Sequence, residues 1–371
     1  MRSLIGEPLQ ALDTPALVID LDVVEDNVRR IQRLTEDAGL QMRPHIKSHK
    51  TPELAQMQIR AGAVGVTCAK IGEAEVMASA GIEDIFIANC LIGETKLRRL
   101  VALARRTPRL SISLESMACA GAASEAFDAA GMTLPVMIEV DLGAGRTGVA
   151  PGRALEFADE VAELPALQIE GLMAYGSHFA YPKRGEEQLA EGAAEEGRLA
   201  AEVAAELAAA GHNMVRISGG STPTAGRYQR GCGLTEIRSG TYIFNDMNQV
   251  DIGSCTVDQV ALSVLATVVA HPVRERAIID AGTKGLDQQV GQTSKGYGWL
   301  RDVPGAVVYK INDEHGFVDV SEAERDLRIG EKVRVIPPRT PTCLNLYDWM
   351  WLVRGGVVVD AWRIAARGRN T

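Results

Sequence analysis

The sequence lacks the excess of basic residues that recognition of a phosphate backbone requires. Its 371 residues include 39 Lys and Arg against 48 Asp and Glu, which gives a formal net charge of −9 and an isoelectric point near 5.3. Nucleic-acid-binding proteins usually present a basic face that neutralises phosphates. We therefore expect no nucleic-acid partner and favour a small-molecule partner.

Paired cysteines and long apolar runs are also lacking. The six cysteines are widely scattered, no two of them form a Cys-x-x-Cys pair, and no secretory signal is evident. These features argue against a disulfide framework and against a zinc ribbon. No apolar run reaches the ~18 to 20 residues that a membrane-spanning helix needs. We expect a cytoplasmic protein with reduced thiols and no membrane association.

Alternating strand-like and helix-like runs fill the chain between Gln41 and Thr241. Short β-rich runs are separated by stretches rich in Ala, Glu and Leu, such as 185–211, whose closing Gly211 suits a helix C-cap. Parallel strands joined by crossover helices produce this alternation. The eight candidate strands are 42–47, 64–69, 84–89, 110–116, 134–143, 167–176, 213–220 and 236–244.

The predicted fold class is α/β, with a closed (β/α)8 barrel, because eight alternations in about 200 residues match that fold. A doubly wound open sheet is the alternative. After Asn245 the composition is that of strands, with almost no helical period. We therefore predict a barrel over 14–248, and a mostly β domain made of 1–13 and 249–371.

Lys47 is the first candidate for function, because the active site of a (β/α)8 barrel lies at the carboxyl ends of the strands. It ends the first predicted strand, within QMRPHIKSHK at 41–50. The neighbouring cations Arg43 and Lys50, with partial burial, would lower the pKa of the Lys47 ammonium and favour the neutral amine that a Schiff base requires. A lone lysine at a strand end would more simply be a surface residue, and this charged context argues against that reading.

Two glycine-containing segments follow later strands. In SGGSTPT, at 218–224, backbone N–H groups can approach an anion and the Ser221 and Thr222 hydroxyls add donors, which suits a phosphate near the last barrel strands. Tyr242, one predicted strand later, is another candidate donor. Arg146 lies on a glycine-flanked loop that permits close approach to a ligand. A strand-end lysine, a phosphate cradle and a loop arginine together predict a pocket for pyridoxal phosphate.

The order of these motifs along nearly the whole chain resembles the D-threonine aldolase/D-serine dehydratase family. The matching segments read TPALVIDLD, RPHIKSHK, EVDLGAGRTGV, GLMAYG, SGGSTPT, GTYIFND, DAGTKG, DEHG and AARGR. The resemblance implies a pyridoxal-phosphate enzyme with an alanine racemase-like barrel of fold type III, followed by a β domain. It also implies an amino acid as substrate and a homodimer as the assembly.

The resemblance implies roles for individual residues. Lys47 is the Schiff-base lysine, Arg146 contacts the phenolic oxygen of the cofactor, and Tyr175 lies beside the pyridine ring. His45 and His49 belong to the same motif, and from their context we expect them to orient their neighbours through hydrogen bonds, with direct proton transfer as the alternative. The implied phosphate-binding positions are Ser218, Gly219, Gly220, Ser221, Thr222 and Tyr242.

The sequence departs from the family at its metal site. Members that cleave or dehydrate β-hydroxy amino acids bind a divalent metal through a His-x-Cys or His-x-Asp pair just before Pro-Thr-x-Asn. Here the stretch reads IPPRTPTCLNLYD, which places Pro338 and Thr340, or Arg339 and Pro341, at the two positions. Neither register supplies a histidine or an anionic ligand, and the single thiol of Cys343 does not make a site. We predict that the metal is absent.

A second departure concerns proton transfer. The family often places a histidine six residues after the barrel tyrosine, where it takes the proton of the β-hydroxyl. Counting from Tyr175 leads to Tyr181, and His178 lies three residues before it. We take Tyr181 and His178 as catalytic candidates, with a solvated loop histidine as the alternative for His178.

Three enzymatic functions and one non-enzymatic function stay open. A lyase would cleave a β-hydroxy-D-amino acid by a retro-aldol reaction. A dehydratase would expel hydroxide, a poor leaving group that needs a strong acid or a metal, so the missing metal favours the aldolase. A racemase would need only bases on opposite faces, with Lys47 on one of them. A vitamin-B6 carrier would keep the pocket without the reaction.

Overall fold

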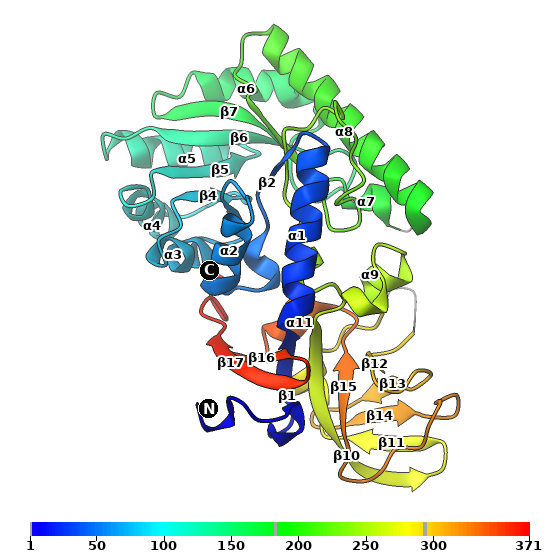
Figure 1. Cartoon of the computed structure of the whole chain (residues 1–371). Coiled ribbons are helices and arrows are strands. Elements are labelled where there is room, and N and C mark those ends of the chain that lie inside the picture. Colours follow the sequence, from blue (N-terminus) through cyan, green and yellow to red (C-terminus); the bar gives the residue numbers. More distant parts are fainter. Residues whose placement is uncertain (1, 182–183, 292–294) are drawn as a thin grey trace. The chain divides into compact units, whose positions relative to one another are not determined.

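The computed structural model of the chain describes residues 2–181, 184–291 and 295–371. Contacts between residues divide the chain into two compact units (Figure 1). The barrel unit comprises Arg29–Gly240 and Gly368–Thr371, and the β unit comprises Met1–Val28 and Thr241–Arg367. In the part of the chain that the structure describes, no helix combines the length and the apolar character that a membrane span requires.

Eight parallel strands form the sheet of the barrel unit, in the order β2-β9-β8-β7-β6-β5-β4-β3. Its two ends meet, because the N–H of Val64 donates to the carbonyl of Met42 at 2.9 Å and the N–H of Thr67 donates to that of Pro44 at 2.8 Å. The predicted closed barrel is therefore confirmed over the open sheet. The strands are β2 (Gln41–Met42), β3 (Val66–Cys68), β4 (Asp84–Ile87), β5 (Arg109–Leu114), β6 (Leu134–Val140), β7 (Leu167–Ala174), β8 (Arg216–Gly219) and β9 (Glu236–Ile237).

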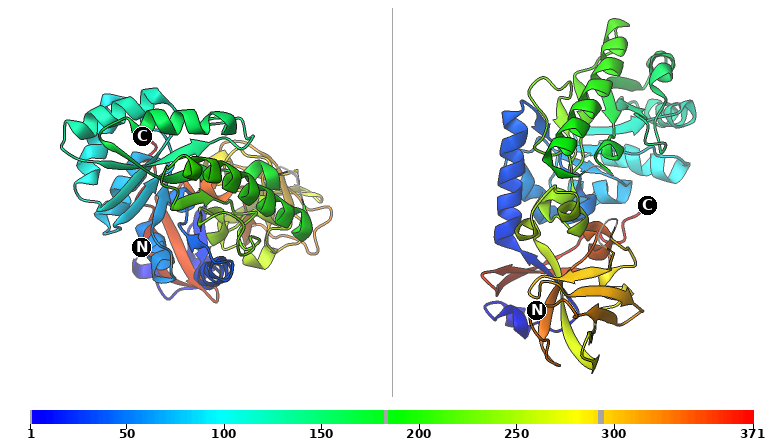
Figure 2. Two further views of the ribbon diagram at one scale, coloured as in Figure 1. Left: turned by 90° about the horizontal axis from the view of Figure 1, so that it is seen from above. Right: turned by 90° about the vertical axis from the view of Figure 1, so that its right-hand side faces the viewer.

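Helices surround this sheet, as the two further views show (Figure 2). Most residues of these strands are buried, and Phe86, Met137 and Met173 pack together in one buried cluster. The longest helix ends as predicted, because Gly211 follows it with a left-handed φ of +98°. The helices are α2 (Pro52–Arg60), α3 (Ile71–Ser79), α4 (Glu94–Ala104), α5 (Met117–Asp128), α6 (Ala154–Ala162), α7 (Ser177–Ala180) and α8 (Gly185–Ala209), while α1 (Leu21–Asp37) spans the boundary between the units.

Nine strands form the sheet of the β unit, in the order β11-β14-β13-β12-β15-β10-β1-β16-β17. Its core includes Leu12, Val18, Leu265 and Val358, all fully or almost fully buried. Among the described residues of this unit, three short α-helices accompany the sheet: α9 (Met247–Asp251), α10 (Thr283–Leu286) and α11 (Thr340–Leu344). The strands are β1 (Ala16–Asp20), β10 (Leu262–Val273), β11 (Arg276–Ile279), β12 (Gly298–Leu300), β13 (Val307–Ile311), β14 (Gly316–Asp319), β15 (Lys332–Ile336), β16 (Trp349–Arg354) and β17 (Val357–Arg363).

The structure differs from the predicted elements and bounds at β1, at Lys47 and at Tyr242, and at the end of the chain, where Gly368–Thr371 belong to the barrel unit. Strand β1, which the predicted boundary at residue 14 counts with the barrel, pairs with β10 and β16 of the β unit. Lys47 does not end a strand, because β2 stops at Met42 and the chain turns into the 3₁₀ helix η3 (Ile46–Ser48). Likewise β9 stops at Ile237, and Tyr242 lies in the 3₁₀ helix η5 (Thr241–Ile243) of the β unit.

Candidate active site

The backbone of Lys47 is held by the imidazole that precedes it. His45 is the N-cap of η3, and its Nδ1 accepts the N–H of Lys47 at 3.5 Å. Burial, with the charges of Lys47 and Arg238, keeps the pKa of His45 well below its ordinary value. The ring is therefore neutral near pH 7, and with Nδ1 as acceptor its hydrogen sits on Nε2. Lys47 itself is only half-buried.

His49 has an orienting role as well. Its Nδ1 accepts the N–H of Thr51 at 3.1 Å, and its Nε2 lies 3.2 Å from Oε1 of Gln58. Burial lowers the pKa of His49 to about 4, so this ring is also neutral. Both histidines of the Lys47 segment therefore make hydrogen bonds to their neighbours, which is consistent with the expected orienting role.

The two cations expected to act on Lys47 are balanced by carboxylates instead. Lys50 Nζ lies 2.9 Å from Oε1 of Glu73 and donates to Oδ1 of Asn370 at 3.1 Å. Arg43 donates to Oε2 of Glu236 at 2.9 Å and also pairs with Asp84. These carboxylates lie far away in the sequence, so nothing near Lys47 in the chain indicated that its neighbours were paired.

Glu236 stays ionised beside Arg43. Burial alone would raise the pKa of Glu236, but the charges of Arg43 and Arg216 outweigh it and hold the pKa at about 2. The charge of Arg43 is therefore compensated within an ion-pair cluster that also includes Asp84 and Arg216.

Arg238 is the cation that the sequence did not single out. It follows β9 at the carboxyl end of the eighth strand, it is buried, and it donates to Oγ of Ser218 at 2.8 Å and to the carbonyl of Ala174. Burial lowers the pKa of Arg238, and the nearby Glu236, among other acidic groups, opposes that shift. Its position at the end of the eighth strand, directly before Ser239 and Gly240, was the signal that could have identified it.

The loop that carries Arg146 is organised by Asp141. The Asp141 carboxylate accepts the N–H groups of Gly143, Ala144 and Gly145 at 2.7 to 3.2 Å. Arg146 is exposed, and its Cζ lies 4.6 Å from the centre of the Tyr175 ring. This distance permits a cation–π contact. The structure thus brings together two residues that the resemblance assigns to the cofactor.

The segment after β7 carries both catalytic candidates. His178 lies in α7, packs against Phe179 with 4.0 Å between ring centres, and is half-buried. A side-chain carbon placed on Gly143 would lie 3.4 Å from Nε2 of His178, so the ring borders the loop of Arg146. Within the described residues, Nδ1 of His178 is buried without a hydrogen-bond partner. These facts do not fit a solvated loop histidine. Tyr181 is half-buried just after α7.

The predicted phosphate cradle follows β8, but two of its N–H groups are engaged within the protein. The N–H of Gly220 donates to Oε1 of Glu196 at 2.8 Å, and that of Ser221 donates to Oγ1 of Thr224 at 3.1 Å. Backbone donors at these two positions therefore do not explain anion binding. The hydroxyls of Ser221 and Thr222 stay the predicted donors from this loop.

The barrel residues form one connected group. His45 lies near both Lys47 and Arg238, Arg238 lies near Tyr175, and Tyr175 contacts Arg146. The group contains three cations, Lys47, Arg146 and Arg238, and hydroxyl donors follow the barrel strands nearby. Such a set suits an anionic ligand that carries a phosphate and a phenolic oxygen. The donor set therefore fits pyridoxal phosphate. Tyr242 belongs to the β unit, where it is buried.

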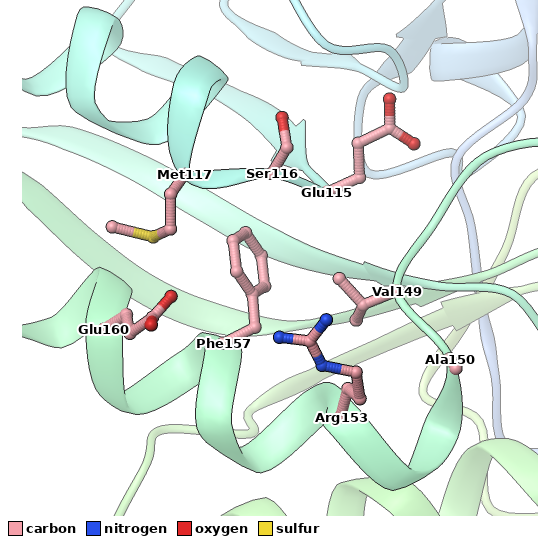
Figure 3. Close-up of a pocket in the computed structure, with 8 residues that line it drawn as sticks. All are labelled: Glu115, Ser116, Met117, Val149, Ala150, Arg153, Phe157 and Glu160. Atoms are coloured by element: carbon pink, nitrogen blue, oxygen red, sulfur yellow. The ribbon is translucent and has the colours of Figure 1, made fainter.

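A separate cavity of about 280 Å³ lies on the barrel unit beyond the Arg146 loop (Figure 3). Phe157 lies at its centre, with Met117 and Glu160 to one side and Arg153 below. Glu115 also lines it, and its carboxylate accepts the N–H of Gly148 at 2.6 Å. None of the predicted site residues lines this cavity, so it is not the predicted pocket.

The segment at the family's metal position is packed within the β unit. The carbonyl of Pro338 accepts the N–H of Asn248 at 3.3 Å, and Arg339 caps α11 with an exposed side chain. The buried thiol of Cys343 donates to the carbonyl of Gly285 at 3.3 Å, and burial raises its pKa. Cys343 is therefore a protonated donor rather than a thiolate ligand. Across 2–181, 184–291 and 295–371, no three His, Cys, Asp or Glu side chains group as metal ligands.

Comparisons with known proteins cover both units. The family model of the alanine racemase N-terminal domain matches residues 19–247, and one described as "Putative serine dehydratase domain" matches 261–353. A D-threonine aldolase from Arthrobacter sp is 37% identical over 98% of this chain and 95% of that protein. D-threo-3-hydroxyaspartate dehydratase from Delftia sp. (strain HT23) is 34% identical over 89% and 91%. The crystal structure of D-threonine aldolase from Filomicrobium marinum matches with a TM-score of 0.89 at 32% identity, over 99% of both chains.

Proposed function

The chain belongs to the D-threonine aldolase/D-serine dehydratase family of pyridoxal-phosphate enzymes, and we propose that it is a lyase. Its reaction would be the retro-aldol cleavage of a β-hydroxy-D-amino acid. The observation that carries the proposal is the 37% identity to a D-threonine aldolase over 98% of the chain. The connected group around Lys47 and Arg238 supports it, because its charge suits the family's cofactor.

We assign the cofactor to residues of the barrel. Lys47 would hold it through Nζ, Arg146 would bind its phenolic oxygen, and Tyr175 would lie against its ring, where Arg146 already contacts the tyrosine. Ser221 and Thr222 would donate to its phosphate. When bound, pyridoxal phosphate supplies an electron sink for the bond that breaks at Cα.

Tyr181 and His178 are the groups we assign to proton transfer. A base must take the proton of the β-hydroxyl as the Cα–Cβ bond breaks and the aldehyde leaves. His178 suits this role because its buried Nδ1 has no hydrogen-bond partner among the described residues. Tyr181 lies three residues later, at the position where the family often has a histidine.

Retro-aldol cleavage is favoured over dehydration by the residues at the metal position. Dehydration expels hydroxide, which needs a strong acid or a metal, whereas aldol cleavage needs only a base at the β-hydroxyl. The positions that would bind the metal hold Pro338 and Thr340, or Arg339 and Pro341, and the Cys343 thiol is engaged with Gly285. None of these is a good ligand for a divalent ion.

The test of the function is one assay with three readouts. Purified enzyme with pyridoxal phosphate is incubated with D-threonine, and released aldehyde, 2-oxo acid and inverted enantiomer are measured side by side. We expect aldehyde and glycine in equal amounts. A dominant 2-oxo acid would establish a dehydratase, a dominant enantiomer a racemase, and no product with any β-hydroxy-D-amino acid a carrier.

We predict that turnover does not depend on a divalent metal, for the reasons given for the segment at Pro338–Cys343. Enzyme dialysed against a chelator is expected to keep its full rate of aldehyde release. Metal content is measured on the same sample by elemental analysis. Stoichiometric metal, or activity lost on chelation and restored by manganese, magnesium or zinc, would show that ligands come from residues not identified here.

Replacing Arg146 by alanine is expected to weaken cofactor binding by about 10-fold and to shift the pH titration of the visible band upward. A cation beside a phenolic oxygen stabilises its ionised form, so its loss raises the pKa of that group, and one charge-assisted hydrogen bond accounts for the affinity. Arg153→Ala is the matched control, since this exposed arginine pairs with Glu156 on the neighbouring surface. A titration unchanged in Arg146→Ala would place Arg146 away from the cofactor.

We also propose a cytoplasmic homodimer. The family resemblance is the reason for the dimer, and the scattered cysteines are the reason for a reducing compartment. Sedimentation of the purified protein tests the assembly, and a monomer at micromolar concentration would contradict it.

A further inference from the structure

A buried carboxylate outside the assigned residues joins the two loops at the carboxyl ends of β7 and β8. Glu196 lies on α8, drawn in green in Figure 1, and is fully buried. Its Oε1 accepts the N–H of Gly176 at 2.9 Å and the N–H of Gly220 at 2.8 Å. Gly176 follows Tyr175, and Gly220 lies in the predicted phosphate loop. One oxygen therefore connects the two loops that carry most of the assigned residues.

The second oxygen of Glu196 extends the connection deeper into the phosphate loop. Oε2 accepts the hydroxyl of Tyr228 at 2.6 Å, and that hydroxyl lies 2.9 Å from Oγ1 of Thr224. Thr224 in turn accepts the N–H of Ser221. Burial, followed by the charge of Glu196, raises the pKa of Tyr228, so the phenol stays protonated and can donate. Two successive N–H groups of the phosphate loop, at 220 and 221, are thus fixed directly or indirectly by Glu196.

The glycines next to this carboxylate fit closely around it. A side-chain carbon at Gly176 would lie 2.6 Å from both Cγ and Cδ of Glu196, and one at Gly219 would lie 3.2 Å from Oε1. A larger residue at Gly176 would force the carboxylate to shift, and one at Gly219 would contact it tightly. The contact is therefore a packed and hydrogen-bonded junction rather than a surface interaction.

We propose that Glu196 is a positioning residue, which holds the phosphate loop 218–224 and the segment 175–181 in one fixed arrangement for cofactor binding and proton transfer. The proposal rests on the proposed function in taking these two loops as the cofactor site. Glu196 acts through the loops, since its oxygens are occupied by Gly176, Gly220 and Tyr228. Its charge also reaches Arg238, where it opposes the lowering of the pKa by burial.

Two substitutions of Glu196 distinguish the effect of its hydrogen bonds from the effect of its charge. Glu196→Ala leaves the N–H groups of Gly176 and Gly220 buried without an acceptor. Glu196→Gln keeps one oxygen for both N–H groups and presents its amide to Tyr228, so it retains the junction while removing the charge. We expect E196A to bind pyridoxal phosphate about 10- to 100-fold more weakly than wild type, and E196Q to bind like wild type.

The measured quantities are the dissociation constant of pyridoxal phosphate, from titration of the apoenzyme followed by the visible band, and the melting temperature of the apoenzyme. A merely structural role would lower the melting temperature of E196A without changing the dissociation constant, and that result would overturn the proposal. An equal loss of affinity in E196A and E196Q would also overturn it, since charge rather than position would then be responsible.

Gly176→Ala is the second variant, for the case that E196A does not fold. The added carbon would lie 2.6 Å from Cγ and Cδ of Glu196 and 2.8 Å from Cδ2 of Phe179, so it displaces the carboxylate without deleting it and also moves the Phe179 ring. Gly176 is not in the left-handed region, so no backbone strain is introduced. We expect weaker cofactor binding here too, and wild-type affinity in G176A would overturn the proposal. If the wild-type protein binds pyridoxal phosphate but releases no aldehyde, only the proposed reaction is contradicted. The proposal for Glu196 is still tested, because the dissociation constant and the melting temperature do not depend on which reaction the enzyme catalyses.

Discussion

Replacing Lys47 by alanine is expected to remove the visible absorption band of the cofactor-loaded protein and to lower turnover by about 10⁴- to 10⁶-fold, the scale found when a covalent catalytic residue is deleted. The expectation follows from the place of Lys47 at the mouth of the barrel. There its backbone is fixed by His45, and Arg238 lies close enough to the same imidazole to lower its pKa.

Borohydride reduction followed by peptide mapping identifies the lysine directly. We expect the label on Lys47 alone. Lys284→Ala is the matched control, because this exposed lysine pairs with Glu314 at the surface, and we expect its band and turnover to match wild type. Label on Lys50 or Lys284 would overturn the assignment. Of these two lysines, Lys50 is the more plausible alternative attachment site, because it lies three residues from Lys47. Its Nζ is, however, bound to Glu73 and Asn370.

The second large effect is expected for Tyr181→Phe, which should lower turnover by about 10² to 10⁴, the usual range for a positioned acid–base group. The substitution removes only the hydroxyl, so cofactor affinity and the visible band should stay as in wild type. Tyr309→Phe is the control, because Tyr309 lies exposed on β13 of the β unit. Unchanged turnover in Tyr181→Phe would remove Tyr181 from proton transfer.

His178→Gln, compared with His212→Gln, then decides the second candidate. His212 is paired with Asp159 at the surface, and its replacement is expected to leave turnover unchanged. A loss of turnover in His178→Gln with unchanged Tyr181→Phe would assign the proton to His178, whose Nδ1 is buried without a partner in the described part of the chain.

The parts of this protein that could be predicted are those that depend on local sequence. Short β-rich runs marked the eight barrel strands, and Gly211 marked the end of α8. Lys47 was recognised as a candidate from its predicted place at the end of the first strand and from its charged neighbours. Its 3₁₀ turn was not, because the turn depends on the side chain of His45 accepting the Lys47 N–H.

What could not be predicted depends on residues that are distant in sequence. Arg43 meets Glu236 across 193 positions, and Glu196 reaches Gly176 and Gly220 across 20 and 24. A buried polar side chain on a helix has the same local signature whether it packs, caps or positions a loop. The positioning role proposed for Glu196 therefore follows from its contacts with three partners in the structure, which its local sequence does not indicate.

The Asp141 carboxylate has a consequence for the thermodynamics of ligand binding. The loop it holds contains Gly143, Gly145 and Gly148 around Arg146, and glycine-rich chain has more conformational freedom to lose than any other. Because three N–H groups are already bound to Asp141, most of that freedom is lost when the protein folds. An anion that meets Arg146 then encounters a loop that is ordered in advance, and the entropy of ordering it no longer subtracts from the binding free energy.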